Sequence, residues 1–338
     1  MPKNLQEKIL ENILLRYPKK PDAVDAISQL LGVGKDGVYR RLRGDTFLNP
    51  DELSKLSQHF QISLDSLVFE RTDTVFFVFN MFSKPVKSFE DYVESVYTEI
   101  FQLQRLPDAH VQYATTEIPI FYYTLFPELF CFKLYTWGRT VWDFPYLRKH
   151  LFDFSLVSPP VIAKMSAVMR LYFHLPSTEI WSVGIVDNTL GQIEFHLNSG
   201  GFKNPPDALV LCDCLRDLTR HLRLMATEGF KVELPDKAGN IVHNSPFQLY
   251  HNEMVNTNNT IFVTTAVGRV LFTTLATPNF IRSTDERVCD YKEEWFQMII
   301  SKSIPITTQS EKSRDWFFNR LEQKIALVRR RIELVLSE

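Results

Sequence analysis

The sequence predicts two regions of different fold class. Residues 1–70 are expected to form an all-α domain of about five short helices, because apolar residues recur at helical spacing between tight turns. Residues 75–338 are expected to form an α+β region, mostly helical, with a late antiparallel β meander and a long terminal helix. Only 12 of the 338 residues are Gly and 27 are Phe, which favours long helices around a large aromatic core.

Turn signals place the ends of the N-terminal helices. Helices are expected over residues 5–14, 22–31, 35–43 and 50–60, followed by a short helix after Ser63. Two prolines in the segment 17–21 end the first helix, and Gly32 and Gly44 end the next two. Asn49 caps the fourth helix and Pro50 occupies its first position, where the missing N–H of proline has no cost.

The second region begins after a polar junction, Glu70–Asp73, which is the expected domain boundary. Val75–Phe79 is predicted to be a buried strand or the first element of a new core. Mostly helical segments are predicted over 88–105, 118–138, 159–173, 178–198, 205–228, 285–302 and 311–336. The segment 239–282, rich in Thr, Val, Ile and Phe, is predicted to be the antiparallel meander. The change of pattern near residue 235 marks an alternative second boundary.

The segment Ile27–Gly44 has the spacing of a helix-turn-helix. That motif needs a small residue where the helices cross, a glycine in the turn and an apolar anchor, and Ser28, Gly32 and Val38 meet those needs. Val38 and Leu42 lie one turn apart and would face the core. The residues left on or beside the outer face are Lys35, Asp36, Gly37, Tyr39, Arg40 and Arg43.

On these residues the N-terminal module resembles the phage-repressor-like (XRE-type) helix-turn-helix family. The resemblance includes Gly44-Asp45, the capped helix over 50–60 and the segment Ile62–Asp65, and covers about residues 4–68. Two departures stand out. Gly34 replaces the usual capping Ser or Thr, and Gly37 lies inside the second helix, where glycine costs ~1 kcal/mol relative to alanine. Gly37 could instead let the backbone approach DNA closely.

The resemblance implies double-stranded DNA as the partner. Residues 1–70 hold ten basic and ten acidic side chains, yet residues 35–43 carry a local charge of +3. An arginine in the major groove can bind guanine with two hydrogen bonds. The candidate DNA-binding residues are Lys35, Asp36, Gly37, Tyr39, Arg40, Arg41, Arg43, Lys19 and Lys20. Arg41, Lys19 and Lys20 are the candidates for phosphate. The alternatives are an ordinary solvated face and a module that contacts protein.

A stripe on the terminal helix is a candidate dimer interface. A neutral module offers few phosphate contacts, so a monomer should bind DNA weakly and a dimer would double the contact. The stripe has the a/d spacing of a coiled coil and consists of Phe318, Leu321, Ile325, Val328, Ile332 and Val335. The alternative is that this helix packs on its own meander.

Residues 71–338 contain no motif for catalysis, metal binding or a cofactor. A phosphate-binding glycine loop, a nucleophile elbow and a zinc pair are all missing from the sequence. Cys212 and Cys214 would point to different sides of a helix and could not chelate one metal. Glu117, Glu128 and Glu179 lie in apolar surroundings. Buried carboxylates can be catalytic, but these are interpreted as capping the helices that begin nearby. We therefore expect no enzymatic activity.

Charge, hydropathy and cysteine content indicate the compartment in which the protein is expected. The net charge of −2 gives no general attraction to nucleic acid or membrane, so a binding surface must be local. The polar N-terminus is unlike a signal peptide. The most hydrophobic stretch, 118–137, contains two charges and two prolines and is therefore not expected to span a membrane. The four cysteines show no disulfide pattern. These features predict a soluble cytoplasmic protein.

The order of the two regions indicates a function for the whole. A small DNA-binding module followed by a larger α+β region resembles one-component bacterial transcriptional regulators, in which the second region senses a ligand or builds the oligomer. The second region itself is not assigned to a family. Its aromatic-rich segment 121–142 fits a ligand pocket, an oligomer interface or plain core. The rival hypothesis is a scaffold protein whose small module contacts a partner protein.

Overall fold

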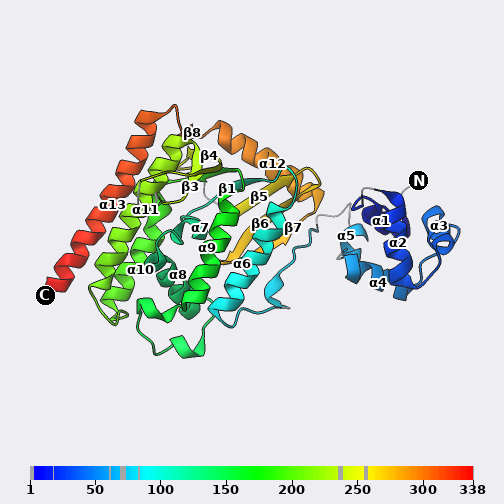
Figure 1. Ribbon diagram of the computed structural model, residues 1–338, viewed down its shortest axis with the longest axis horizontal. Helices are drawn as coiled ribbons and strands as arrows, with labels where there is room; N and C mark the ends of the chain where they lie inside the picture. Colours follow the sequence, from blue (N-terminus) through cyan, green and yellow to red (C-terminus); the bar gives the residue numbers. More distant parts are fainter. Residues whose placement is uncertain are drawn as a thin grey trace. The chain divides into compact units, whose positions relative to one another are not determined.

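A computed structural model describes residues 4–17, 19–60, 62–68, 74–82, 84–234, 239–254 and 258–337 (Figure 1). The chain divides into two compact units, Met1–Phe76 and Phe77–Glu338. The expected junction Glu70–Asp73 lies outside the described residues. Within the described part of the chain, each helix is too short or too polar to cross a membrane.

The first unit is helical, as predicted. Its helices are α1 (Leu5–Leu14), α2 (Lys20–Leu31), α3 (Lys35–Arg43), α4 (Pro50–Phe60) and α5 (Leu64–Val68). Gly32 and Gly44 end α2 and α3 with φ of 67° and 81°, a left-handed conformation that glycine adopts without strain. A small apolar core built around Ile9, Ile27 and Leu56, all 0% exposed, holds the helices together.

The second unit is built around one mixed sheet. Its strands are β1 (His110–Ala114), β2 (Ser177–Trp181), β3 (Phe230–Val232), β4 (His243–His251), β5 (Thr260–Thr265), β6 (Gly268–Ala276), β7 (Asn279–Ser283) and β8 (Ile304–Pro305). The order across the sheet is β3-β4-β2-β1-β5-β6-β7, and β8 pairs with β4. β4, β2 and β1 run parallel, whereas β1, β5, β6 and β7 form antiparallel pairs.

Helices cover both faces of this sheet. They are α6 (Phe89–Gln104), α7 (Ile120–Tyr123), α8 (Pro127–Thr140), α9 (Pro159–Phe173), α10 (Asp187–Asn198), α11 (Asp207–Glu228), α12 (Glu286–Ser301) and α13 (Glu311–Ser337). Ala114, Ile180 and Phe262 face α12, whereas the larger core on the opposite face is completed by α6–α11 and α13. Figure 1 shows α6 beside α9, and α10, α11 and α13 as a group. Single-turn helices are Asn80–Phe82, Pro145–Leu147, Phe154–Leu156 and Val183–Val186.

Three expectations for this unit are corrected. The segment 178–198 is not helical throughout, because Ser177–Trp181 forms strand β2. Val75–Phe79 is not a buried strand: its Val78 makes an isolated bridge to Arg282 and is 52% exposed. The predicted meander over 239–282 is confirmed only for β5, β6 and β7. β4 does not belong to it, because β2 and β1 lie between β4 and β5.

The alternative boundary near residue 235 is also wrong. Strands from before it, β1 and β2, pair directly with β5 and β4 from after it. Splitting the chain there would remove the sheet's own hydrogen-bonding partners. Residues 77–338 accordingly form one compact unit.

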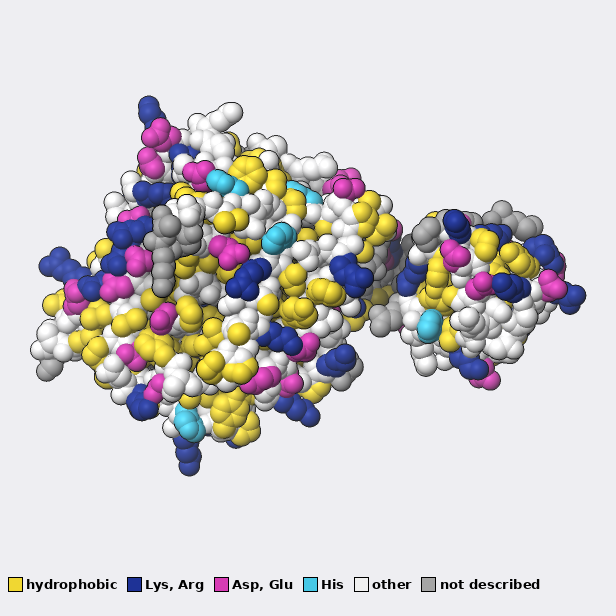
Figure 2. All heavy atoms as spheres, viewed as in Figure 1, with side chains coloured by type: hydrophobic (Ala, Val, Ile, Leu, Met, Phe, Trp, Pro, Cys, Tyr) yellow, Lys and Arg dark blue, Asp and Glu magenta, His cyan; other side chains and the backbone are white. Residues whose placement is uncertain are grey.

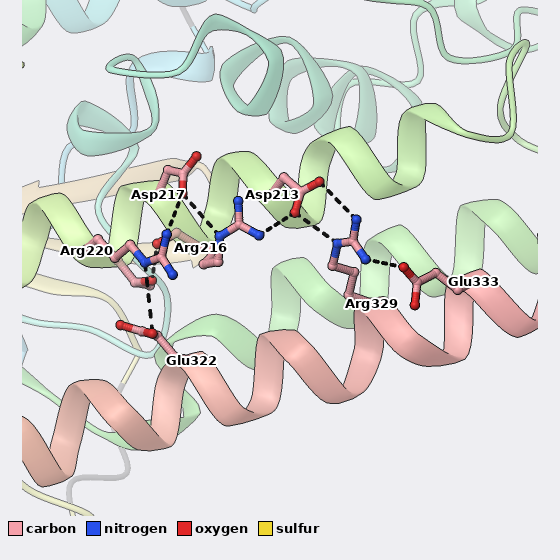
Figure 3. Close-up of polar contacts among 8 residues, drawn as sticks. Asp213, Arg216, Asp217, Arg220, Glu322, Arg329 and Glu333 are labelled. Atoms are coloured by element: carbon pink, nitrogen blue, oxygen red, sulfur yellow. Dashed lines mark hydrogen bonds and ion pairs between the residues drawn. The ribbon is translucent and has the colours of Figure 1, made fainter.

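The apolar stripe of α13 is used inside the chain. Phe318, Leu321, Ile325, Val328 and Ile332 are at most 6% exposed and belong to the main core, where α13 packs on α11. Ion pairs flank this seam (Figure 3): Arg329 binds Asp213 of α11 at 2.9 Å, and Arg220 lies 4.0 Å from Glu322. The expectation of a dimer interface is therefore wrong for these five residues. Val335 alone of the stripe is largely exposed, at 45%.

Candidate nucleic-acid interface

The connection between α2 and α3 is locked by local hydrogen bonds. The Ser28 hydroxyl donates to the carbonyl of Val33 at 2.6 Å, and the Val33 N–H donates to the carbonyl of Ser28 at 3.2 Å. Gly32 between them provides the left-handed turn, and Val38 anchors α3 with no exposed surface. The residue types predicted to fix the helix pair thus occupy those structural roles.

Gln6 holds the loop that follows α3, a role that sequence reasoning missed. Its amide nitrogen donates to the carbonyls of Arg41 and Thr46, at 2.8 and 2.9 Å, and its amide oxygen accepts from the N–H of Leu48 at 2.6 Å. Gln6 is 7% exposed, so these bonds are shielded from water. A signal was present: Gln6 lies three and four residues before Ile9 and Leu10, on the apolar face of α1.

Arg41 ties α3 to α4 and is not placed to bind DNA phosphate. Its guanidinium pairs with Glu52 through bonds of 2.7 and 3.2 Å and also donates to the carbonyl of Gly37 at 3.0 Å. The two charged side chains are only 13% and 12% exposed. Glu52 additionally accepts from the N–H of Asn49 at 3.1 Å, which completes the cap of α4. The expectation for Arg41 is corrected, because its donors are already engaged.

Gly37 lies on the same side of α3 as Arg41. A methyl group added there would meet Arg41 Nη1 at 3.5 Å and Val33 Cβ at 3.7 Å, which are ordinary contact distances. A side chain at position 37 would thus contact residues of the first unit itself. This geometry gives no support to a special role for Gly37 in close approach to DNA.

Gly37→Ala should therefore stabilise α3. Alanine is favoured over glycine inside a helix by about 0.5–1 kcal/mol, and the space for its methyl group exists. Hydrogen exchange of the α3 amides should slow by about threefold, as measured by mass spectrometry on the full chain. Gly32→Ala is the matched control and should speed exchange, since its φ of 67° strains alanine. Faster exchange in Gly37→Ala would contradict the packing described here.

Two other candidates form solvent-exposed ion pairs. Lys35 contacts Asp25 of α2 at 2.5 Å, and this hydrogen bond raises the pKa of the Lys35 ammonium. Arg43 contacts Asp45 at 2.8 Å. Both cations are at least 60% exposed. Exposed pairs contribute little stability, so either cation can exchange its carboxylate for a phosphate at small cost.

Arg40, Lys19 and Lys20 are the uncommitted cations of this surface. All three are exposed, and none has a side-chain hydrogen bond or ion pair to another residue in the described ranges. Asp36 is exposed on the same helix as Arg40, and Tyr39 is half-buried between them. On the face seen in Figure 2, the basic side chains of the first unit stand among carboxylates and do not form one continuous patch. On this face, a DNA contact would have to come from a few particular cations.

Glu117 and Glu179 in the second unit do not cap helices, contrary to expectation. Glu179 is fully buried on β2 and accepts from the Tyr122 and Tyr172 hydroxyls, at 2.5 and 2.7 Å, and from the Trp181 indole at 3.2 Å. Burial raises its pKa. Glu117 accepts from the ammonium of Lys133, which has no exposed surface. Glu128 lies in the first turn of α8, but the N-cap of that helix is Phe126 and no side chain caps it.

These buried carboxylates do not form a metal site. The parts of the chain that the structure describes contain no group of three or more His, Cys, Asp or Glu side chains able to hold a metal ion. Cys212 is buried on α11, and burial raises the pKa of its thiol to about 12, which keeps it protonated. Glu179 accepts from hydroxyl and indole groups and Glu117 accepts from an ammonium, an arrangement that orders a core.

Comparison of the chain with protein-family models, curated proteins and solved structures gives no match. Function must therefore be argued from the site itself.

Proposed function

We propose that this protein is a sequence-specific DNA-binding transcriptional regulator, with α2 and α3 acting as a helix-turn-helix. The observation that carries the proposal is the outer face of α3. Arg40 is exposed and uncommitted there, between Lys35 and Arg43, whose weak surface pairs can open. The helix presenting them is held rigidly by Ser28, Gln6 and the Arg41–Glu52 pair. A rigid helix with a free arginine suits reading of base edges in a major groove.

The neutral charge of the first unit favours binding as a dimer. Few cations are free to contact phosphate, so two modules on a two-fold site would be needed for strong binding. The stripe on α13 is unavailable for this purpose, and the pairing surface is left open by the proposal. The four cysteines are all free, which suits a reducing compartment, and we place the activity in the cytoplasm.

The first experiment is selection from a random duplex library with the full-length protein at about physiological salt. The expected result is an enriched motif with two-fold symmetry. Absence of enrichment, from protein shown to be folded, would count against the proposal.

Arg40→Ala should relax base preference. Loss of a two-bonded contact to guanine costs about 1–3 kcal/mol at one base pair, so the selected motif should lose information at one position per half-site. Lys20→Ala should instead weaken binding to every sequence and lower the salt slope by about one. Arg330→Ala, which removes an exposed cation from α13 in the second unit, is the matched control and should change neither. Equal losses by Arg40→Ala on specific and random DNA would refute its assigned role.

The rival, a module that contacts protein, makes a different prediction about salt. Binding to DNA releases counterions and must weaken steeply as salt rises. A complex with a partner protein that persists at high salt, in a protein that fails to enrich DNA, would favour the rival.

A further inference from the structure

The second unit contains a cavity between α6 and the sheet. Its volume is about 170 Å³. The apolar face of α6 forms one wall, with Tyr92, Val96 and Ile100 spaced four residues apart. Val111 of β1 and Val263 of β5 form the opposite wall. α6 packs mainly on α9, and residues of β5, β6 and β7 also line the cavity.

The size and lining of the cavity define the apolar part of a ligand. A 150 Å³ cavity lined by aliphatic and aromatic side chains stays dry and takes up benzene. The present cavity is similar in volume and is lined mostly by aliphatic and aromatic side chains. It therefore suits one six-membered ring or a short branched chain. A nucleotide or a sugar phosphate would be too large and too polar.

One edge of the cavity is charged. Arg282 of β7 lies there with Glu99 of α6, whose carboxylate is 3.4 Å from the guanidinium and also accepts from the Asn80 amide at 3.3 Å. Lys84 lines the same cavity. Two cations and one carboxylate leave a single positive charge in excess. The Arg282–Glu99 contact is long and engages one guanidinium nitrogen, so other donors of Arg282 remain for a ligand oxygen.

Tyr92 adds a donor inside the cavity. Burial raises the pKa of its hydroxyl far above the usual value, so the group keeps its proton. No hydrogen bond joins this hydroxyl to another side chain in the described residues. A ligand oxygen could accept a hydrogen bond from this hydroxyl, as it could from the guanidinium of Arg282.

We propose that this cavity binds a small monocarboxylic acid whose apolar body is about one ring in size. The ring would lie against Val96, Val111 and Val263, and the carboxylate would face Arg282 and Lys84. A carboxylate matches the excess positive charge and the forked donor geometry of arginine. A neutral ligand would not compensate the excess positive charge, and a protonated amine would be repelled by it.

The cavity is also connected to the start of the second unit. Val78 lines it and exchanges two backbone hydrogen bonds with Arg282, of 2.8 and 3.0 Å. Val78 lies two residues after Phe76, the last residue of the first unit. An acid bound to Arg282 would thus restrain the segment that leads out of the first unit. The interpretation of this ligand as a regulatory effector rests on the proposed function, whereas its binding does not.

The test is titration of 4-fluorophenylacetate into the full chain, followed by fluorine NMR. The neutral 4-fluorotoluene and the cationic 4-fluorobenzylamine serve as matched probes of the same ring. The acid should bind at least tenfold more tightly than either. Arg282→Gln should weaken the acid at least tenfold and leave fluorotoluene unchanged. Arg282→Lys, which keeps the charge and loses the forked donors, should recover only part of the loss. Arg330→Gln, which changes an exposed arginine on α13, is the control and should have no effect.

Other outcomes overturn the proposal. Absence of acid binding to the wild-type chain, or equal binding of all three probes, would refute the ligand class. Acid binding that survives Arg282→Gln, in protein with unchanged circular dichroism, would place the acid elsewhere. Because the titration contains no DNA, its failure leaves the helix-turn-helix proposal untouched. Failure of DNA selection would likewise leave the ligand site standing.

Discussion

Lys133→Met should lower the free energy of unfolding of the second unit by about 3–5 kcal/mol. The Lys133 ammonium has no exposed surface, donates to Glu117 and to Gln192 at 2.7 Å, and lies over the rings of Tyr123 and Trp137. Methionine fills similar volume but leaves the Glu117 carboxylate buried without its cation. An unpaired buried charge is one of the largest penalties a single substitution can introduce.

Two variants separate charge from packing in this test. Glu117→Gln combined with Lys133→Met removes both charges, and its loss should be less than half that of Lys133→Met alone. Lys149→Met changes an exposed lysine and should shift stability by less than about 0.5 kcal/mol. Urea unfolding followed by tryptophan fluorescence measures all three. A double variant as unstable as Lys133→Met would show that the methionine, and not the orphaned carboxylate, causes the loss.

Lys231 should make the stability of the second unit rise with pH between about 7 and 9. Its ammonium is fully buried, donates to the carbonyls of Tyr172 and Leu175, and lies 3.6 Å from the centre of the Tyr172 ring. Burial lowers its pKa to about 7, against the smaller opposing effect of Glu179. In the unfolded chain its pKa is about 10.4. The unfolded state therefore binds more protons in this range, and raising the pH favours the folded state by about 1 kcal/mol per pH unit.

Lys231→Met isolates this effect. The buried thiols act in the opposite direction, because burial raises their pKa. Above about pH 8.5 they stay protonated in the folded chain and lose protons in the unfolded chain, so their effect is to lower stability as the pH rises. The difference between wild type and Lys231→Met cancels that contribution. Unfolding midpoints in urea, measured at several pH values, should rise with pH between about 7 and 9 in the wild type. The variant should lack this rise and show the flatter or more downward profile. Parallel profiles would mean that Lys231 titrates normally.

Local signals account for what the sequence predicted well. The N-terminal helices follow from turn residues such as Gly32 and Asn49, and the helices over 286–301 and 311–337 from long periodic stretches. Strand β2 was missed because it is buried on both faces, which removes the alternation that marks a half-exposed strand. The order of the sheet depends on pairing between distant segments, and no short window of sequence encodes it.

The polar networks could not be predicted from the sequence for the same reason, because their members lie far apart along the chain. Glu179 and Tyr122 are 57 residues apart in sequence, and Glu117 and Thr189 are 72 apart, so neither network could be assembled from spacing. The spacing within one helix places Arg41 beside the core but does not show its partner Glu52, which lies on the next helix, eleven residues away. The outward positions of Arg40 and Asp36 could be predicted, since they depend on the period of one helix and the position of Val38. DNA binding itself stays a prediction.

The interleaved sheet and the seam of α13 on α11 fix the order in which the chain can fold during synthesis. In the described part of the first unit, the residues of the apolar core lie no later than Leu67, so this unit can fold soon after leaving the ribosome. The second unit has no complete core until Ile332 is available. At about 5–20 residues per second, roughly 10–50 seconds separate these events. During that interval the buried face of α11 lacks its cover, and the nascent chain carries a finished small unit beside an exposed apolar surface that chaperones recognise.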